Sequence, residues 1–249
     1  MAGLYDVLEI REDPQWIDET FALPIMIQMT KAMCRNTGYS GYIADRINQK
    51  CLYVSENIQN WFGMSSEVFL SLGNKEYSKF MLDEELKKMK EVNSKMNTFF
   101  TKIPSSERQN HTLSFDAHIL LKGDNHLAHY NISPLSFTKD GRMKLYLCLV
   151  SLSAQNDFGN VEISKEGSDV KFVYSFVNHK WNETKIMKLS STERDILLLS
   201  ASGASAEEVG KQLFKSISAV KACKQKTFKK MGVDSIAQAL TKARNWNLI

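Results

Sequence analysis

The sequence predicts an α+β protein with two domains: an N-terminal antiparallel sheet with flanking helices, followed by an all-α domain of four helices. The first observation is size, because 249 residues suit two ordinary hydrophobic cores better than one. The second is composition, since 43% hydrophobic and 24% charged residues are typical of folded globular proteins. The third is periodicity: strand-like alternation dominates the first part of the chain, and helical spacing of apolar residues dominates the last part.

These patterns divide the chain into four segments. A helix is expected at about Trp16–Arg35, where Pro24 indicates a break or a start. The short polar sequence SKEGSD (164–169) is the best candidate for a linker. The predicted segments are a helical extension, a sheet domain, a linker that can add extra strands, and a C-terminal helical domain, at residues 1–34, 35–160, 161–187 and 188–249.

Within the sheet domain, short apolar runs alternate with turn residues. Two strands are expected at Tyr42–Ala44 and Cys51–Val54, with a polar turn between them. An amphipathic helix is expected at Asp83–Met96, and three further strands within His111–Leu152. The last of these, KLYLCLVSL, is apolar on both faces, which indicates a central strand.

This order of strand, strand, short helices, longer helix and three-stranded meander resembles a PAS domain over roughly residues 35–155. The resemblance depends on a strand pair that leads into the sequence YVSENIQNWFG (53–63). It implies a five-stranded sheet whose concave face holds a small ligand or a partner helix. We therefore expect a sensor or dimerisation domain with a small-molecule or protein ligand, whose identity the sequence does not give.

The C-terminal segment contains signals for three short helices, Ser191–Ala201, Ser205–Phe214 and Ser216–Lys230, and a fourth at about Ser235–Asn245. Serines begin each of them, and one start is a capping box in which a glutamate follows three residues after the serine. Helices this short are unstable alone, so they are expected to pack together. From Leu189 onward there are ten Lys and Arg against five Asp and Glu, so the excess positive charge of the chain lies here.

The third of these helices has two different faces on a helical wheel. Val220, Ile217, Thr227 and Met231 are expected on the buried side. The opposite side is cationic, because residues 215–233 contain six lysines and no acidic residue. A lysine-rich face on an isolated helix is usually only solvated, but such a helix also fits the major groove of DNA.

The C-terminal segment also contains a specific pattern of residues at fixed spacing, namely Leu189, Ser190, Thr192, Glu193, Asp195, Leu197, Gly203, Ser205, Glu208, Ser216, Val220, Lys221, Lys230, Met231, Gly232 and Val233. With this pattern, the last 60 residues or so resemble the LuxR-type (GerE-like) helix-turn-helix along their whole length. The sequence departs from the family pattern at Ala219, where a threonine is usual, and at Cys223, where a histidine is usual.

The resemblance implies a DNA-binding transcription regulator that binds double-stranded DNA. The base-contacting positions of the family fall on Lys221, Ala222 and Gln225, which the wheel also places on the outer face. The family further implies that the last helix, at about Ile236–Arg244, pairs two domains, so a homodimer is expected. The full predicted set of DNA-binding residues is Ser216, Ser218, Ala219, Lys221, Ala222, Lys224, Gln225, Lys226 and Lys229.

Other classes of function lack a sequence signature. The four cysteines are far apart, and the histidines between residues 111 and 129 have no metal-ligand spacing, so no metal or cofactor is expected. No phosphate-binding loop or nucleophile motif is present, so no catalytic residue is predicted. The sequence shows no phosphorylatable receiver domain. No apolar run is long enough to span a membrane and the start of the chain is acidic, which predicts a cytoplasmic protein without membrane contact.

Two alternatives remain open. The departures at Ala219 and Cys223 allow a degenerate domain that no longer binds DNA and acts as a protein-interaction or dimerisation module. DNA binding would weaken steeply with rising salt, which a protein contact of mixed polarity need not do. An enzyme is the third hypothesis, and it would need an active site without any sequence signature.

Overall fold

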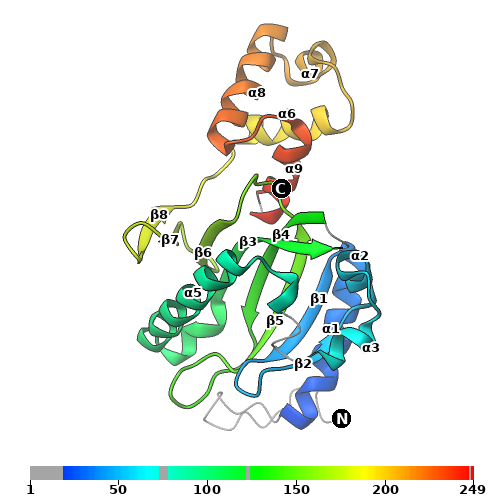
Figure 1. Ribbon diagram of the computed structural model, residues 1–249. Coiled ribbons are helices and arrows are strands. Elements are labelled where there is room, and N and C mark those ends of the chain that lie inside the picture. Colours follow the sequence, from blue (N-terminus) through cyan, green and yellow to red (C-terminus); the bar gives the residue numbers. More distant parts are fainter. Residues whose placement is uncertain (1–18, 73–77, 122–123, 247) are drawn as a thin grey trace, which may run out of the picture.

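The computed structural model describes residues 19–72, 78–121, 124–246 and 248–249, and in this part the protein is α+β, as predicted (Figure 1). A sheet domain is followed by a small helical domain at the C-terminal end. The strands are β1 (Ser40–Asp45), β2 (Lys50–Val54), β3 (His111–Leu121), β4 (Asp124–Pro134), β5 (Leu145–Leu152), β6 (Gly159–Lys165), β7 (Val170–Ser175) and β8 (Lys180–Lys185).

The helices cover the sheet and form the C-terminal domain. Short 3-10 turns lie at Glu56–Ile58, Ser78–Phe80 and Ser105–Asn110. The helices are α1 (Glu19–Thr37), α2 (Gln59–Phe62), α3 (Ser66–Ser71), α5 (Asp83–Lys102), α6 (Ser191–Ala201), α7 (Ala206–Leu213), α8 (Ile217–Met231) and α9 (Ile236–Asn245).

The eight strands form one antiparallel sheet in the order β2-β1-β5-β4-β3-β6-β7-β8. Its first five strands, with short helices and the long α5 between β2 and β3, have the element order that the PAS resemblance implies. β5 lies between β1 and β4, which explains why its sequence is apolar on both faces. The helix and strands predicted for this domain are confirmed, and β1, β2 and α5 are longer than the sequence indicated.

The main core lies between the sheet and α5, which runs along one face of it (Figure 1). α5 buries Val92 and Phe100, and β3 buries Phe115 and Ile119 on the facing side. Val92 and Phe100 are eight residues apart and so lie on one side of α5, and Phe115 and Ile119 are four residues apart and so lie on one face of β3.

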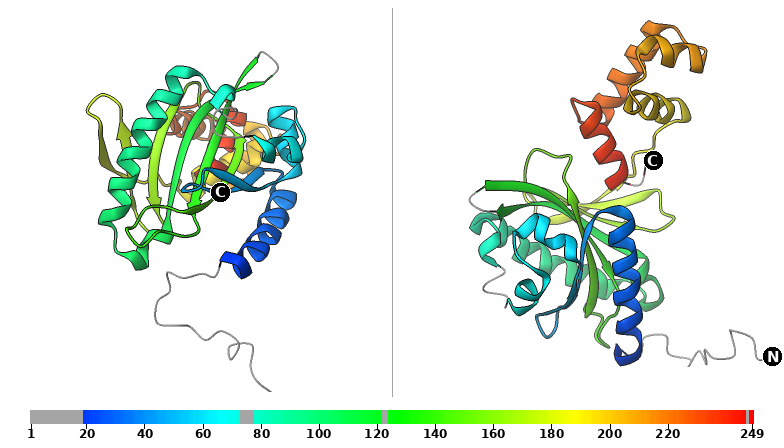
Figure 2. Two further views of the ribbon diagram at one scale, coloured as in Figure 1. Left: turned by 60° about the horizontal axis from the view of Figure 1, so that its bottom comes forward. Right: turned by 90° about the vertical axis from the view of Figure 1, so that its right-hand side faces the viewer.

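The helix α1 packs against β1, as Figure 2 shows for the segment drawn in dark blue. A methyl group added to Gly41 of β1 would lie 2.5 Å from the sulfur of Cys34, so the helix and the strand are in close contact. The helix continues through Pro24, where the sequence indicated a break or a start. Of the predicted helical extension at 1–34, residues 1–18 lie outside the described residues.

The expected linker at SKEGSD is wrong, because these residues belong to the end of β6 and the turn into β7. The extra strands allowed for residues 161–187 do form, and they extend the main sheet beyond β3, with Ile163 opposite Phe172. Polar residues and a glycine suit a hairpin turn as well as a linker. The chain passes into the helical domain after β8, between Ile186 and Ser190.

Candidate nucleic-acid interface

The four helices of the C-terminal domain pack around two small clusters of buried side chains. One cluster joins α6, the end of α8, and α9 through residues such as Leu197, Met231 and Ala243. The other joins α6, α7 and α8 through Ile196, Val209 and Val220. The predicted packing of four short helices into one unit is therefore confirmed.

The start of α6 is fixed by a capping box and an ion pair. Ser190, and not the expected Ser191, is the N-cap, and its hydroxyl accepts a hydrogen bond from the backbone nitrogen of Glu193. The Glu193 carboxylate accepts in return from the Ser190 nitrogen at 2.8 Å and pairs with Lys230 of α8 at 2.8 Å. Burial raises the pKa of Glu193, but the hydrogen bonds from Lys230 and Ser190 outweigh it and hold this pKa below its usual value.

The turn between α7 and α8 is tight. The predicted capping box of Ser205 and Glu208 begins α7. A methyl group on Gly210 would lie 2.6 Å from the carbonyl oxygen of Lys215, so the backbones touch where only glycine fits. Phe214 ends α7 in the left-handed conformation, with φ of 52°, and its side chain is 96% exposed.

Helix α8 begins and ends where the sequence predicts. Ser216 caps its start by accepting a hydrogen bond from the Ala219 nitrogen at 3.2 Å. Gly232 ends it in the left-handed conformation, with φ of 62°. Val220, Thr227 and Met231 are buried as expected.

Ile217 is the exception on the expected buried side of α8, because its side chain is 46% exposed. Ile217 is the first residue of the helix, so its side chain lies at the end of the buried side and not within it. The prediction from the wheel was therefore wrong at this position.

All but one of the predicted DNA-binding residues are exposed, at the start of α8 and along it. Lys224 alone is half-buried, with its ammonium group 5.8 Å from the centre of the Phe228 ring. The exposed members are Ser216, Ser218, Ala219, Lys221, Ala222, Gln225, Lys226 and Lys229. We call the exposed side chains of this set the outer face of α8.

The outer face of α8 keeps its positive charge available. Lys221, Lys226 and Lys229 take part in none of the ion pairs found among the described residues. By contrast, Lys211 on α7 pairs with Glu207, and Lys230 at the end of α8 pairs with Glu193. The lysines of the outer face are therefore free to meet an external anion.

The end of α9 contacts the sheet domain, which the sequence did not indicate. The Asn245 side chain bonds to Ser151 and Leu152 at the end of β5, and the ammonium groups of Lys242 and Lys171 lie 4.5 and 4.3 Å from the centre of the Trp246 ring. A cavity of about 480 Å³ adjoins this contact, between α1, β5 and α9. An asparagine and a tryptophan at a helix end carry no signal of such a distant partner.

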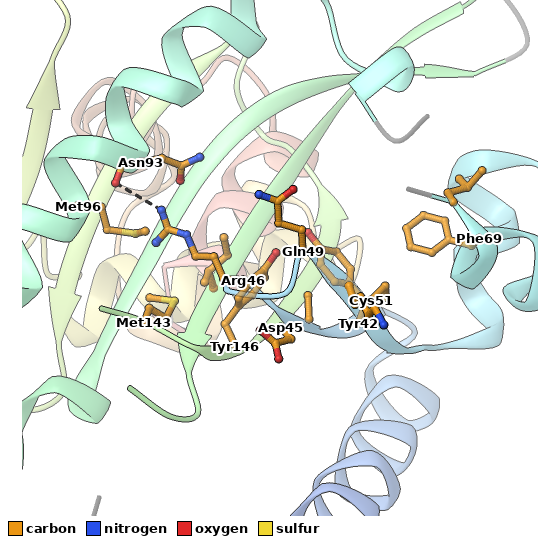
Figure 3. Close-up of a pocket in the computed structure, with 14 residues that line it drawn as sticks. Tyr42, Asp45, Arg46, Gln49, Cys51, Phe69, Asn93, Met96, Met143 and Tyr146 are labelled. Carbon is orange, nitrogen blue, oxygen red and sulfur yellow. Dashed lines mark hydrogen bonds between the residues drawn. The ribbon is translucent and has the colours of Figure 1, made fainter. Parts of the chain in front are cut away.

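A second cavity, of about 360 Å³, lies in the sheet domain between β1, β2, β5 and the helices α3 and α5 (Figure 3). Figure 3 shows the Arg46 side chain pointing toward Asn93 of α5, with Tyr42 and Tyr146 nearby and Phe69 across the cavity. Residues of α3 and α5 line this cavity together with residues of the sheet. Sequence reasoning did not find its lining residues, because they come from four strands, two helices and the segments between them.

Three histidines of the sheet domain have structural partners. Nδ1 of His111 bonds to the Glu107 carbonyl, that of His118 lies 2.5 Å from Glu85, and that of His129 lies 3.0 Å from Asp116. In the described part of the chain, no group of three or more His, Cys, Asp or Glu side chains is placed to hold a metal ion. No helix in that part is long and apolar enough to cross a membrane.

The chain has no match among curated proteins. Among solved structures, a phage VqmA in complex with DPO is 10% identical over 93% of this chain and 91% of that chain, with a TM-score of 0.32. Vibrio cholerae VqmA in a complex with ligand and DNA is 14% identical over 95% and 92%, with a TM-score of 0.31.

A PAS domain of a Colwellia psychrerythraea protein is 12% identical over 51% of this chain and 95% of that chain, with a TM-score of 0.36. Superpositions as loose as these transfer neither a ligand nor a partner from one protein to another. A sequence family does match the C-terminal helices, over residues 187–243. These residues therefore form a domain of the luxR family of bacterial regulatory proteins.

Proposed function

We propose that the protein is a sequence-specific DNA-binding transcription regulator that places α8 in the major groove. The observation that carries the proposal is the outer face of α8, which holds unpaired lysines and no acid, on a domain of the luxR family. An exposed helix of this kind fits the width of the groove, and its lysines neutralise phosphates.

The residues of the outer face take different roles in this proposal. Lys221 and Gln225 reach base edges, where the amide of Gln225 donates and accepts as an adenine edge requires. Lys226 and Lys229 contact phosphates, and Ser216 and Ser218 offer hydroxyl groups at the start of the helix. Ala219 and Ala222 permit close approach of the helix, and Ala222 is suited to contact a thymine methyl group. Lys224 reaches the phosphate backbone from beside Phe228.

The protein acts as a homodimer in this proposal. Helix α9 pairs two helical domains on a two-fold site, as the resemblance to the LuxR type implies. Helix α1 offers a second contact, because Ile25 and Met29 are 51% and 68% exposed on it. Apolar side chains exposed side by side on one helix are typical of surfaces that a partner covers.

The sheet domain is the sensor in this proposal. It holds a cavity of about 360 Å³, within the size range of small-molecule sites. Its contact with α9 through Asn245 gives a physical connection to the helical domain. Occupation of the cavity would then change how the helical domains are presented to DNA.

A selection from random DNA duplexes with the full-length protein tests the proposal. We expect an enriched palindrome with the wild type, and its loss in the double variant Lys221→Ala/Gln225→Ala. The variant must keep the unfolding temperature of the wild type, so that loss of enrichment reports on DNA contacts. No enriched sequence at low salt would overturn the proposal.

A second candidate function is a protein-interaction module with a degenerate DNA-binding domain. The exposure of Phe214 and Ile217 beside the outer face favours it, since apolar side chains suit a protein partner. Salt dependence separates the two: DNA binding through about six phosphates loses a thousandfold or so in affinity between low and moderate salt. A partner contact through Phe214 and Ile217 would change little over that range.

A further inference from the structure

The charges around the cavity of the sheet domain do not balance. Arg46 and Lys50 line it, and Asp45 is the one acidic side chain among its described lining residues. The Asp45 carboxylate already accepts hydrogen bonds within the turn between β1 and β2. It accepts hydrogen bonds at 2.9, 2.9 and 2.8 Å from the backbone nitrogens of Ile47 and Asn48 and from the Asn48 side chain. The cavity is therefore cationic.

The guanidinium of Arg46 has only neutral partners among the described residues. Its Nη1 donates to the side-chain oxygen of Asn97 at 3.0 Å, and its Nη2 donates to the backbone oxygen of Asn93 at 3.4 Å. Burial lowers the pKa of Arg46, but an arginine stays charged at neutral pH. A half-buried charge without a counterion is costly, and a guanidinium has five N–H donors, of which these two bonds use two.

Apart from the side chains of Gln49 and Asn93, the rest of the cavity wall is apolar or aromatic. The Tyr42 ring lies 6.3 Å from that of Phe69 and 6.1 Å from that of Tyr146, measured between ring centres. Leu72 and Met96 add aliphatic surface. A ligand that fits this wall has a flat or short apolar body next to its charged group.

We propose that the cavity binds a small organic carboxylate, with its carboxylate on Arg46 and its apolar body against Tyr42, Phe69 and Tyr146. The planar guanidinium binds a carboxylate through two parallel hydrogen bonds, which gives both charge and orientation. The inference rests on the proposal that the sheet domain is a sensor, and it names the class of ligand that is sensed.

Two substitutions separate the charge of Arg46 from the shape of the cavity. Arg46→Gln removes the charge. Asn97→Asp keeps the shape of the side chain and places a carboxylate where Nη1 of Arg46 already donates at 3.0 Å, so the protein supplies its own counterion. Arg35→Gln, on the exposed end of α1, is the matched control that removes a charge away from the cavity.

The experiment uses the full-length protein and pairs of probes that differ only in charge. Benzoate is compared with benzamide, indole-3-acetate with indole-3-acetamide, and hexanoate with hexanamide, at constant ionic strength. Thermal unfolding is measured with each probe at about 10 mM, where a ligand with a Kd of about 1 mM fills roughly nine-tenths of the sites. Calorimetric titration then gives the Kd of the acid that stabilises the protein most.

We expect at least one acid to raise the unfolding temperature while its amide does not. Arg46→Gln and Asn97→Asp should each raise the Kd of that acid by roughly tenfold to a hundredfold, as loss of a charge-assisted hydrogen bond requires. Arg35→Gln should leave it unchanged. An equal effect of acid and amide, no effect of any acid, or full affinity in both cavity variants would overturn the inference.

The outcome is independent of whether the protein binds DNA. The random-duplex selection is run on ligand-free Arg46→Gln, which leaves the outer face of α8 intact. If an enriched palindrome is found and the acids have no effect on unfolding of the wild type, carboxylate binding is rejected and the proposal of a DNA-binding regulator stands. If the protein binds carboxylates but no DNA sequence is enriched, the proposal of a DNA-binding regulator is rejected and carboxylate binding stands.

Discussion

The side-chain nitrogen of Asn245 donates a hydrogen bond to the backbone oxygen of Leu152 at 3.1 Å, which attaches the last turn of α9 to the end of β5. The oxygen of the same amide accepts from the Ser151 hydroxyl at 3.3 Å. One side chain thus uses both of its polar groups to join the helical domain to the sheet domain.

Asn245→Ala should loosen this connection. We expect a loss of about 1 kcal/mol in the free energy of unfolding, because two neutral hydrogen bonds are removed at a partly exposed position. Hydrogen exchange should speed up at residues 236–246 and stay unchanged in β3. Asn178→Ala, in the exposed turn between β7 and β8, is the control. Unaltered exchange in α9 would mean that Asn245 does not hold the two domains together.

Lys221→Ala and Gln225→Ala should each relax the sequence preference at one base pair. The expected change is about 1 to 3 kcal/mol in discrimination, the size of a good contact to a base edge. Binding to a panel of single-base variants of the selected palindrome measures it. Lys226→Ala is the contrasting variant, since loss of a phosphate contact weakens binding to all sequences alike. If Lys221→Ala weakens binding to all DNA sequences equally, Lys221 contacts the DNA backbone and not a base.

Lys229→Ala should lower the salt dependence of DNA binding. The slope of log K against log salt is expected to fall by about one unit for each half-site, because one fewer counterion is released. Titrations at four salt concentrations give this slope. Lys180→Ala, on β8 of the sheet domain, should leave the slope unchanged. An unaltered slope for Lys229→Ala would place that lysine outside the interface.

Glu193→Gln should change how the stability of the protein depends on pH. The folded pKa of Glu193 lies below its value in the unfolded chain, so its stabilisation is present above a pH of about 4.3 and disappears as the pH falls through the folded pKa. The variant should lose about 1 to 2 kcal/mol at neutral pH and show a smaller further loss in acid.

Denaturant unfolding at pH 7 and at lower pH values measures both effects. Glu207→Gln is the matched control, because Glu207 pairs with Lys211 at 2.8 Å but both side chains are mostly exposed. Pairs of that kind contribute little. Equal pH profiles for wild type and Glu193→Gln would contradict the role given to the Lys230 ion pair.

Phe214→Gly should stabilise the helical domain. The left-handed conformation at Phe214 costs about 1 kcal/mol for a residue with a side chain, and the exposed ring loses no burial when it is removed. Phe214→Ala removes the ring but keeps the strain, so it should bring no such gain. If both variants lose DNA affinity equally, the ring itself contributes to binding. If Phe214→Gly is no more stable than Phe214→Ala, the left-handed backbone conformation at this position is not strained.

Local signals in the sequence predicted local structure well. Ser205 and Glu208 lie three residues apart, and Gly232 follows the last turn of α8 directly, so the helix ends depend on neighbours along the chain. The outer face of α8 was predictable for the same reason, since one helix contains both its lysines and its buried side.

Features that depend on distant segments were not predictable. A helical wheel assumes that neighbours cover a helix along its whole length, and Ile217 at the first position of α8 does not meet that condition. The turn at residues 164–169 has linker composition because a hairpin and a linker use the same residues. The Asn245 contact and the position of Arg46 against α5 arise only when strands and helices far apart in sequence come together.

The contact of Gly210 with the Lys215 carbonyl has a consequence for how new specificities can arise. The close approach of these two backbones and the buried pair Val209 and Val220 fix how α8 packs against α7, so this packing does not depend on the side chains that point outward. Those side chains can therefore be exchanged without turning the helix away from its approach. Under the proposed function, single substitutions of Lys221, Ala222 and Gln225 can therefore change which DNA sequence is preferred, while Gly210 and the packing of α8 stay the same.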